Sequence, residues 1–142
     1  MQDENTLYGQ NERQHSRKLV LTSDDKTTIQ ALKEVADKFS TKRDWAKFHN
    51  PKDLSIGIVT EGSELLAIFR FKTDKEVKQI LGNQLMANQI KHELADVLFF
   101  ILRFSQMTGT DLTEAFLEKM KLNEIRYPVD KSKGSNKKYT EL

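Results

Sequence analysis

The sequence contains no cysteine, and this absence excludes several classes of site at once. Without thiols there are no disulfides, thiolate zinc sites, iron–sulfur clusters or cysteine nucleophiles. Only three histidines occur among the 142 residues, at His15, His49 and His92, which argues against a histidine-rich metal site. A metal bound by this chain would therefore be held mainly by oxygen ligands.

Glycine and proline are also scarce, with six and two residues, and this favours helices over β folds that need many turns. The longest apolar run, over residues 97–102, is too short to span a bilayer. Because residues 1–10 are polar, we expect no export signal. These features predict a cytoplasmic protein without a membrane partner.

Basic and acidic residues nearly balance, with 23 Lys and Arg against 21 Asp and Glu and a net charge of +2. Such a balance argues against a protein that coats nucleic acid, so we expect no nucleic-acid partner. The length corresponds to one domain. We divide it into an irregular N-terminal arm (1–25), a helical domain (26–128) and a basic C-terminal tail (129–142).

Apolar periodicity and end signals predict the helices. Asn50 followed by Pro51 is a helix start, Thr73 with Glu76 forms a capping box, and Gly109 is a helix stop. The predicted helical segments are residues 25–42, 51–71, 73–108 with a break at Gly82-Asn83, and 111–127. No segment alternates like a strand, so we predict an all-α, four-to-five-helix bundle. These helices are too few to enclose a large core, which predicts completion by oligomerisation.

Acidic residues occur on the helix face where apolar residues belong. At 100° per residue, Glu61 and Glu64 share the apolar stripe of residues 54, 58, 65 and 68. Glu93 and Asp96 repeat the arrangement on the stripe of residues 90, 97, 100 and 104. A single pair of this kind is usually a solvated helix face. Two pairs on two apolar stripes instead predict carboxylates that face the bundle interior.

Four such carboxylates would repel one another, so either their pKa values rise or cations neutralise them. We expect no inward Lys, Arg or His nearby, which favours a metal, and oxygen ligands favour Mg2+, with Mn2+ as a possible substitute. A di-iron bundle would have Glu-x-x-His on two helices, whereas here Glu64 and Asp96 take the third position after Glu61 and Glu93.

These residues resemble the E-x-x-E…E-x-x-D signature of the MazG-like, all-α nucleotide pyrophosphohydrolases. The flanking sequences look most like the dCTP pyrophosphatase branch, over about residues 27–142. They are Arg43-Asp-Trp45, Phe48-His49, Pro51-Lys-Asp-Leu54, Lys119, Asn123-Glu-Ile-Arg-Tyr-Pro128, Lys131-Ser-Lys-Gly134 and Lys138-Tyr-Thr140. The resemblance implies cleavage of a nucleoside triphosphate to a monophosphate and pyrophosphate, by a homodimer or dimer of dimers whose subunits share sites.

The resemblance also implies roles for individual residues. Glu61 and Glu64 would be catalytic, because one of them polarises the attacking water, and they would hold Mg2+ together with Glu93 and Asp96. The phosphate-binding residues would be Lys119, Asn123, Arg126 and, from the basic tail, Lys131. The base-binding residues would be Trp45, Phe71, Phe100 and Tyr127. The alternatives without a functional role are a solvated basic helix face for Lys119 and Arg126 and a position in the apolar core for Trp45.

The sequence departs from the dCTP branch in the expected base pocket. Phe71 stands where that branch tends to carry Trp, Ala36 where a base-facing His can occur, and Phe100 where a Tyr can occur. Each change removes a hydrogen-bond donor. We therefore expect an enzyme that acts on deoxynucleotides such as dCTP with a relaxed base preference.

Two other classes of protein fit parts of the sequence. A metal-free helical interaction module would present its acids in a groove that faces a partner. A nucleic-acid binder would use the lysines of the tail, but only Tyr139 supplies an aromatic among them. Glu64→Ala would stabilise the interaction module but would abolish the activity of the enzyme. The nucleic-acid binder would differ from the enzyme by a steep salt dependence of its binding.

Overall fold

The computed structural model describes residues 23–142, and within this range the chain is helical and contains no strand. The six α-helices are α1 (Ile29–Thr41), α2 (Pro51–Phe69), α3 (Asp74–Gly82), α4 (Gln84–Thr108), α5 (Leu112–Arg126) and α6 (Val129–Ser132). Two 3-10 turns, Ala46–Phe48 and Tyr139–Glu141, complete the secondary structure of the described residues. The all-α prediction is confirmed. Most of the predicted N-terminal arm lies outside the described residues.

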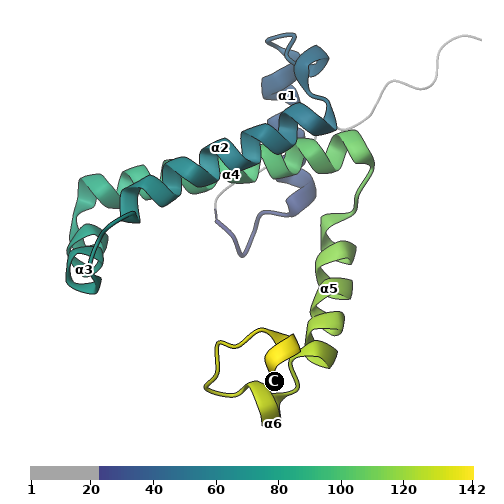
Figure 1. Cartoon of the computed structure of the whole chain (residues 1–142). Coiled ribbons are helices and arrows are strands. Elements are labelled where there is room, and N and C mark those ends of the chain that lie inside the picture. Colours follow the sequence, from purple (N-terminus) through teal and green to yellow (C-terminus); the bar gives the residue numbers. More distant parts are fainter. Residues whose placement is uncertain (1–22) are drawn as a thin grey trace, which may run out of the picture.

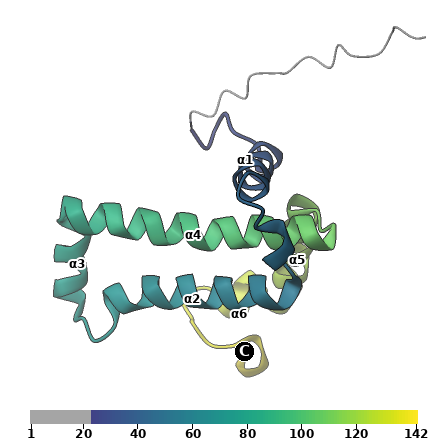
Figure 2. The ribbon, with the colours of Figure 1, turned by 90° about the horizontal axis from the view of Figure 1, so that it is seen from above.

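Helices α2 and α4 form the main structural unit, an antiparallel hairpin. Figure 2 shows α3 joining one end of this hairpin, while α1 crosses α4 near the other end. The close approach of α2 and α4 depends on Gly57. A Cβ at Gly57 would lie 2.4 Å from two ring carbons of Phe100, so the absence of a side chain makes room for this ring.

The helices begin at the capping residues that the sequence predicts. The Asn50 side chain accepts the Asp53 N–H at 3.0 Å at the start of α2. At the start of α3, Thr73 and Glu76 form both halves of a capping box. Asn83 then ends α3 and caps α4, so the predicted break is present.

Other helix boundaries differ from those predicted. Helix α1 begins at Ile29 rather than near residue 25, because the Thr28 side chain accepts the Ala31 N–H and so caps it. Helix α2 ends at Phe69, and Phe71 adopts a left-handed conformation with φ of 60°. Gly109, with φ of 68°, ends α4 as predicted.

The apolar core of one chain is small. Only five apolar side chains are buried among the described residues: Ala31, Ala36, Leu54, Ile68 and Leu102. Helices α5 and α6 extend away from the hairpin instead of closing a bundle around it (Figure 1). No helix in the described range is long and apolar enough to cross a membrane. The helices of the predicted bundle are therefore present, but within a single chain they do not close into a bundle.

A candidate metal and nucleotide site

Three carboxylates from the two hairpin helices come together in an acidic cluster, formed by Glu61 and Glu64 of α2 and Glu93 of α4. One oxygen from each residue lies within 4.8 Å of the others. The i, i+3 spacing on α2 places its two acids on one face, and the antiparallel packing brings α4 against that face. Three of the four predicted metal ligands therefore meet.

The acidic cluster is more open to solvent than the sequence predicts. Glu61 and Glu93 are half-buried, whereas Glu64 and Asp96 are exposed. The expectation that all four carboxylates face a bundle interior is therefore corrected for the single chain. The physical reason is that α5 extends away from the hairpin and does not enclose this face.

Glu61 lies at the electrostatic centre of the site. Its pKa is raised above the ordinary value, first by burial and then by the negative charges of Glu64, Asp96 and Glu93. Asp96 thus acts on the acidic cluster electrostatically although it is not one of its three members. Ionising all four groups together carries a cost that a nearby cation would remove.

The donor set fits a divalent cation. Among the ion pairs of residues 23–142, none involves a residue of the acidic cluster or Asp96. The negative charge is therefore not neutralised by a described Lys, Arg or His within the ion-pair distance. Carboxylate oxygens without such partners are typical ligands for Mg2+ or Mn2+.

An apolar hollow of about 540 Å³, which we call the aromatic hollow, is lined in part by Asp96, the carboxylate that acts electrostatically on Glu61 of the acidic cluster. Its walls include Ala36 of α1, Trp45 of the following connection and Phe100 of α4. The Trp45 ring packs edge-to-face on Phe39, with 5.6 Å between centroids. Two of the four predicted base-binding residues, Trp45 and Phe100, therefore line one hollow, together with the substituted position Ala36.

The other two predicted base-binding residues lie elsewhere in the chain. Phe71 lies between the end of α2 and the start of α3, whereas Trp45 precedes the start of α2, and Phe71 is 87% exposed. Tyr127 follows α5, where its ring packs edge-to-face on Tyr139 at 5.9 Å. One chain does not bring these two rings to the aromatic hollow.

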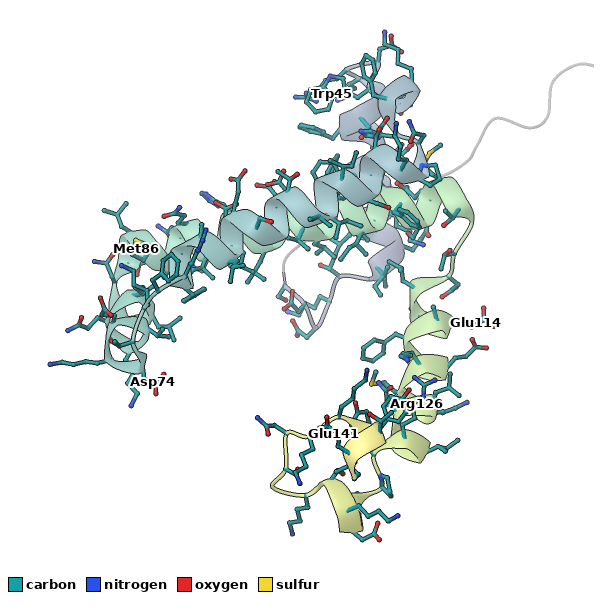
Figure 3. The ribbon with its side chains drawn as sticks, viewed as in Figure 1. Trp45, Asp74, Met86, Glu114, Arg126 and Glu141 are labelled. Carbon is teal, nitrogen blue, oxygen red and sulfur yellow. The ribbon has the colours of Figure 1, made fainter. Side chains whose placement is uncertain are left out.

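The predicted phosphate-binding residues form a separate group on α5 and α6. Lys119 and Arg126 are exposed, Asn123 is half-buried, and Lys131 is exposed on α6. The Arg126 guanidinium lies 5.1 Å from the Tyr139 ring centroid. Figure 3 shows Arg126 on the helix that leads away from the hairpin, and no ion pair within residues 23–142 joins these basic residues to the acidic cluster.

Sequence reasoning missed a buried arginine. Arg103 is only 2% exposed, although no inward-facing cation was expected near the acids. Its guanidinium is paired with Asp37 at 2.7 Å and donates to His49, so it does not neutralise the acidic cluster. The available signal was its spacing, because Arg103 follows Asp96 by seven residues and shares its side of the helix.

The MazG-like family model matches residues 56–142, which contain the acidic cluster and all of α5. The chain belongs to the MazG-like family. Both acidic pairs and the basic residues of α5 and α6 lie within this family region.

Named relatives of this MazG-like chain are pyrophosphatases. Human dCTP pyrophosphatase 1 is 34% identical over 115 residues, which cover 81% of this chain and 68% of the relative. The Bos taurus protein of the same name has the same identity and coverage. A crystal structure of a pyrophosphatase from Archaeoglobus fulgidus superposes with a TM-score of 0.66 and 32% identity, covering 70% of this chain and 92% of the other.

Proposed function

We propose that this protein is a Mg2+-dependent nucleoside triphosphate pyrophosphohydrolase, which converts a (d)NTP and water to a (d)NMP and pyrophosphate. The observation that carries the proposal is the acidic cluster beside the aromatic hollow. A polyanion-binding metal site and an aromatic surface for a base are the two recognition elements of a nucleotide enzyme. The pyrophosphatases named above, of similar sequence and structure, support the same class of reaction.

The metal ligands would be Glu61, Glu64, Glu93 and Asp96. A triphosphate carries several negative charges and would be repelled by these carboxylates alone. When bound, Mg2+ supplies Lewis-acid stabilisation of charge on the phosphate oxygens. The raised pKa of Glu61 supports this assignment, because burial and then repulsion from the other three carboxylates disfavour its charge, and a divalent cation would offset both.

The water-activating residue would be Glu61 or Glu64. A carboxylate oxygen of either residue would accept a hydrogen bond from the attacking water and take up its proton. Water oxygen would bond to the α-phosphorus while the bond from that phosphorus to the α–β bridging oxygen breaks. Pyrophosphate leaves with the bridging oxygen.

The substrate would be a deoxynucleotide such as dCTP, with a relaxed base preference. Trp45 and Phe100 offer aromatic surface to a base, and stacking is sequence-tolerant because every base has a π-face. Ala36 and Phe100 contribute no hydrogen-bond donor to the aromatic hollow. A pocket that lacks such donors rejects a wrong base less strongly.

The phosphate contacts would come from a second subunit in a homodimer or dimer of dimers. Lys119, Asn123 and Arg126 are carried away from the acidic cluster of their own chain on α5, and Lys131 follows on α6. A neighbouring chain could place this basic group opposite the acids, with Phe71 and Tyr127 completing the base site. The two separated charge sets of the near-neutral chain would then meet across an interface.

Substitution Glu64→Ala tests the metal site. We expect Mg2+ at about 100 times its Kd to stabilise the wild type by ~2.7 kcal/mol and this variant by much less. Activity should fall at least about 100-fold, since losing even an outer-shell partner of a metal costs 10- to 100-fold. Glu118→Ala, which removes an exposed acid of α5, is the matched control.

The alternative functions predict other results. A metal-free helical interaction module would show no Mg2+-linked stabilisation, and Glu64→Ala would stabilise it by removing repulsion between acids. A nucleic-acid binder using the basic tail would bind oligonucleotides with a steep salt dependence and would turn over no nucleotide.

A further inference from the structure

A buried polar network joins α1, α4 and the connection that carries Trp45. Arg103 of α4 donates from Nε to Nδ1 of His49 at 3.1 Å, and from Nη1 to Asp37 and Gln106 at 2.7 Å each. Gln106 in turn donates to the backbone carbonyl of Lys33 at 2.9 Å. The guanidinium is therefore held on several sides, and its orientation toward His49 is fixed.

The bond from Arg103 determines which His49 nitrogen carries the proton. A guanidinium has donors and no acceptor, so Nδ1 must be the unprotonated nitrogen. Burial, and then the charge of Arg103, lower the pKa of His49 and favour the neutral ring. A neutral imidazole with an unprotonated Nδ1 carries its hydrogen on Nε2.

The free nitrogen of His49 is reachable from outside. Within residues 23–142, Nε2 has no hydrogen-bond partner. No buried side-chain nitrogen or oxygen in this range lacks a partner, so the unpartnered Nε2 must be accessible to solvent. His49 lines a second hollow, of about 270 Å³, which we call the His49 hollow. Trp45 and Phe100 line both this hollow and the aromatic hollow, so the two adjoin.

We propose that Arg103 is a positioning residue that fixes the Nε2–H form of His49, so that His49 donates a hydrogen bond to an acceptor of the nucleobase held beside Trp45 and Phe100. This inference rests on the proposed function. Besides His49, the His49 hollow is lined by aromatic and aliphatic side chains and by the Asp53 carboxylate, which offers no hydrogen-bond donor when ionised. The complementary ligand is a base with a carbonyl oxygen or an unprotonated ring nitrogen at that edge.

The tautomer is tested by 15N NMR of the histidine side chains in the full-length protein at neutral pH. We expect a protonated Nε2 and an unprotonated Nδ1 at His49, and a mixture of tautomers in Arg103→Met. The His49→Gln spectrum assigns the signals, because the chain has only three histidines. A protonated Nδ1 in the wild type would overturn the proposal.

Steady-state kinetics with Mg2+ and dCTP, or with whichever nucleotide is turned over fastest, test the effect on binding. Arg103→Met should raise KM about 5- to 30-fold, the range for one lost hydrogen bond, with kcat largely retained. Arg103→Lys keeps a donor for Nδ1 and should restore part of the affinity. Asp37→Asn leaves the Arg103–His49 bond in place, because Asp37 pairs with Nη1 whereas His49 accepts from Nε, and should raise KM less.

A double-mutant cycle separates positioning from a general structural role. His49→Gln offers an amide N–H near the Nε2 position whatever its partner, so Arg103→Met should change KM less in that background. Equal changes in both backgrounds, or a fall in kcat with KM unchanged, would contradict the proposal. If Arg103→Met does not fold, the wild-type tautomer and the Arg103→Lys and Asp37→Asn kinetics still decide it. If no nucleotide is hydrolysed, the proposed function is wrong. If the enzyme is active and KM is unchanged in Arg103→Lys, Arg103→Met and His49→Gln, the proposed function stands and only the role of Arg103 and His49 is wrong.

Discussion

At the residue scale, two buried side chains show how much the environment of a group depends on tertiary packing. His49 is 8% exposed and Arg103 is 2% exposed, yet both are polar and both are hydrogen-bonded. The charge of Arg103 is balanced by Asp37, whose side chain remains 54% exposed to solvent. A buried cation of this kind is tolerated because its partners are all in place.

The lowered pKa of His49 predicts a pH dependence of stability. The unfolded chain binds a proton near the ordinary value of 6.5, whereas the folded state resists it until lower pH. The unfolded state therefore binds more protons in this window, and the free energy of unfolding should fall as pH drops from 6.5 through the folded pKa. Denaturant unfolding at several pH values between 5 and 8 measures this free energy of unfolding. The slope of the free energy of unfolding against pH should be flatter in His49→Gln than in the wild type. An equal slope in both proteins would contradict a lowered pKa of His49.

The sequence could predict the acidic cluster but not Arg103. Glu61, Glu64 and Glu93 follow from the helical period, since i, i+3 spacing on two apolar stripes fixes the faces that meet. The burial of Arg103 depends on where α1 and His49 pack against α4, which periodicity does not specify. The exposure of Glu64 and Asp96 also depends on tertiary structure, namely on the path of α5.

At the scale of elements, capping chemistry made helix starts predictable. Asn50 and Thr73 cap the helices that follow them, because their side chains accept backbone N–H groups that a helix start leaves free. The short helix α6 and the 3-10 turn Tyr139–Glu141 were not predicted. Segments of three or four residues are too short to show a hydrophobic period, and the Tyr127–Tyr139 contact that accompanies them is tertiary.

The packing of α2 on α4 gives a prediction for Gly57. The alanine Cβ in Gly57→Ala would overlap the Phe100 ring, and overpacking of this kind costs about 1–3 kcal/mol. Gly62→Ala is the matched control on the same helix, because a Cβ there meets nothing within 4 Å. That variant should gain up to about 1 kcal/mol from helix propensity. Equal stability changes in urea unfolding would show that Gly57 is not a packing requirement.

At the scale of the whole molecule, residues 23–142 expose many large apolar side chains, and extended apolar surface of this kind marks interaction sites. The exposed large apolar side chains on α5 include Phe116, Leu117, Leu122 and Ile125. This helix also carries three of the four predicted phosphate ligands, Lys119, Asn123 and Arg126. Its position in a single chain leaves both its apolar surface and its basic residues without the partners that the proposed function requires.

We therefore expect light scattering after size exclusion to give a mass that is two or four times 16.5 kDa. Phe116→Glu should lower that mass or make it concentration-dependent, because a buried charge at an interface is costly. Thr113→Glu adds the same charge at an exposed polar position of α5 and should leave the mass unchanged. A wild type that remains monomeric at micromolar concentration would contradict the shared-site model.

The central claim is α–β cleavage of a nucleoside triphosphate, and product analysis tests it most directly. The purified protein is incubated with Mg2+ and each dNTP and NTP, and pyrophosphate is separated from orthophosphate. We predict a nucleoside monophosphate and pyrophosphate in equal amounts, only with the divalent cation, and with more than one base accepted. Release of orthophosphate alone, or no turnover of any nucleotide by the folded protein, would contradict the account.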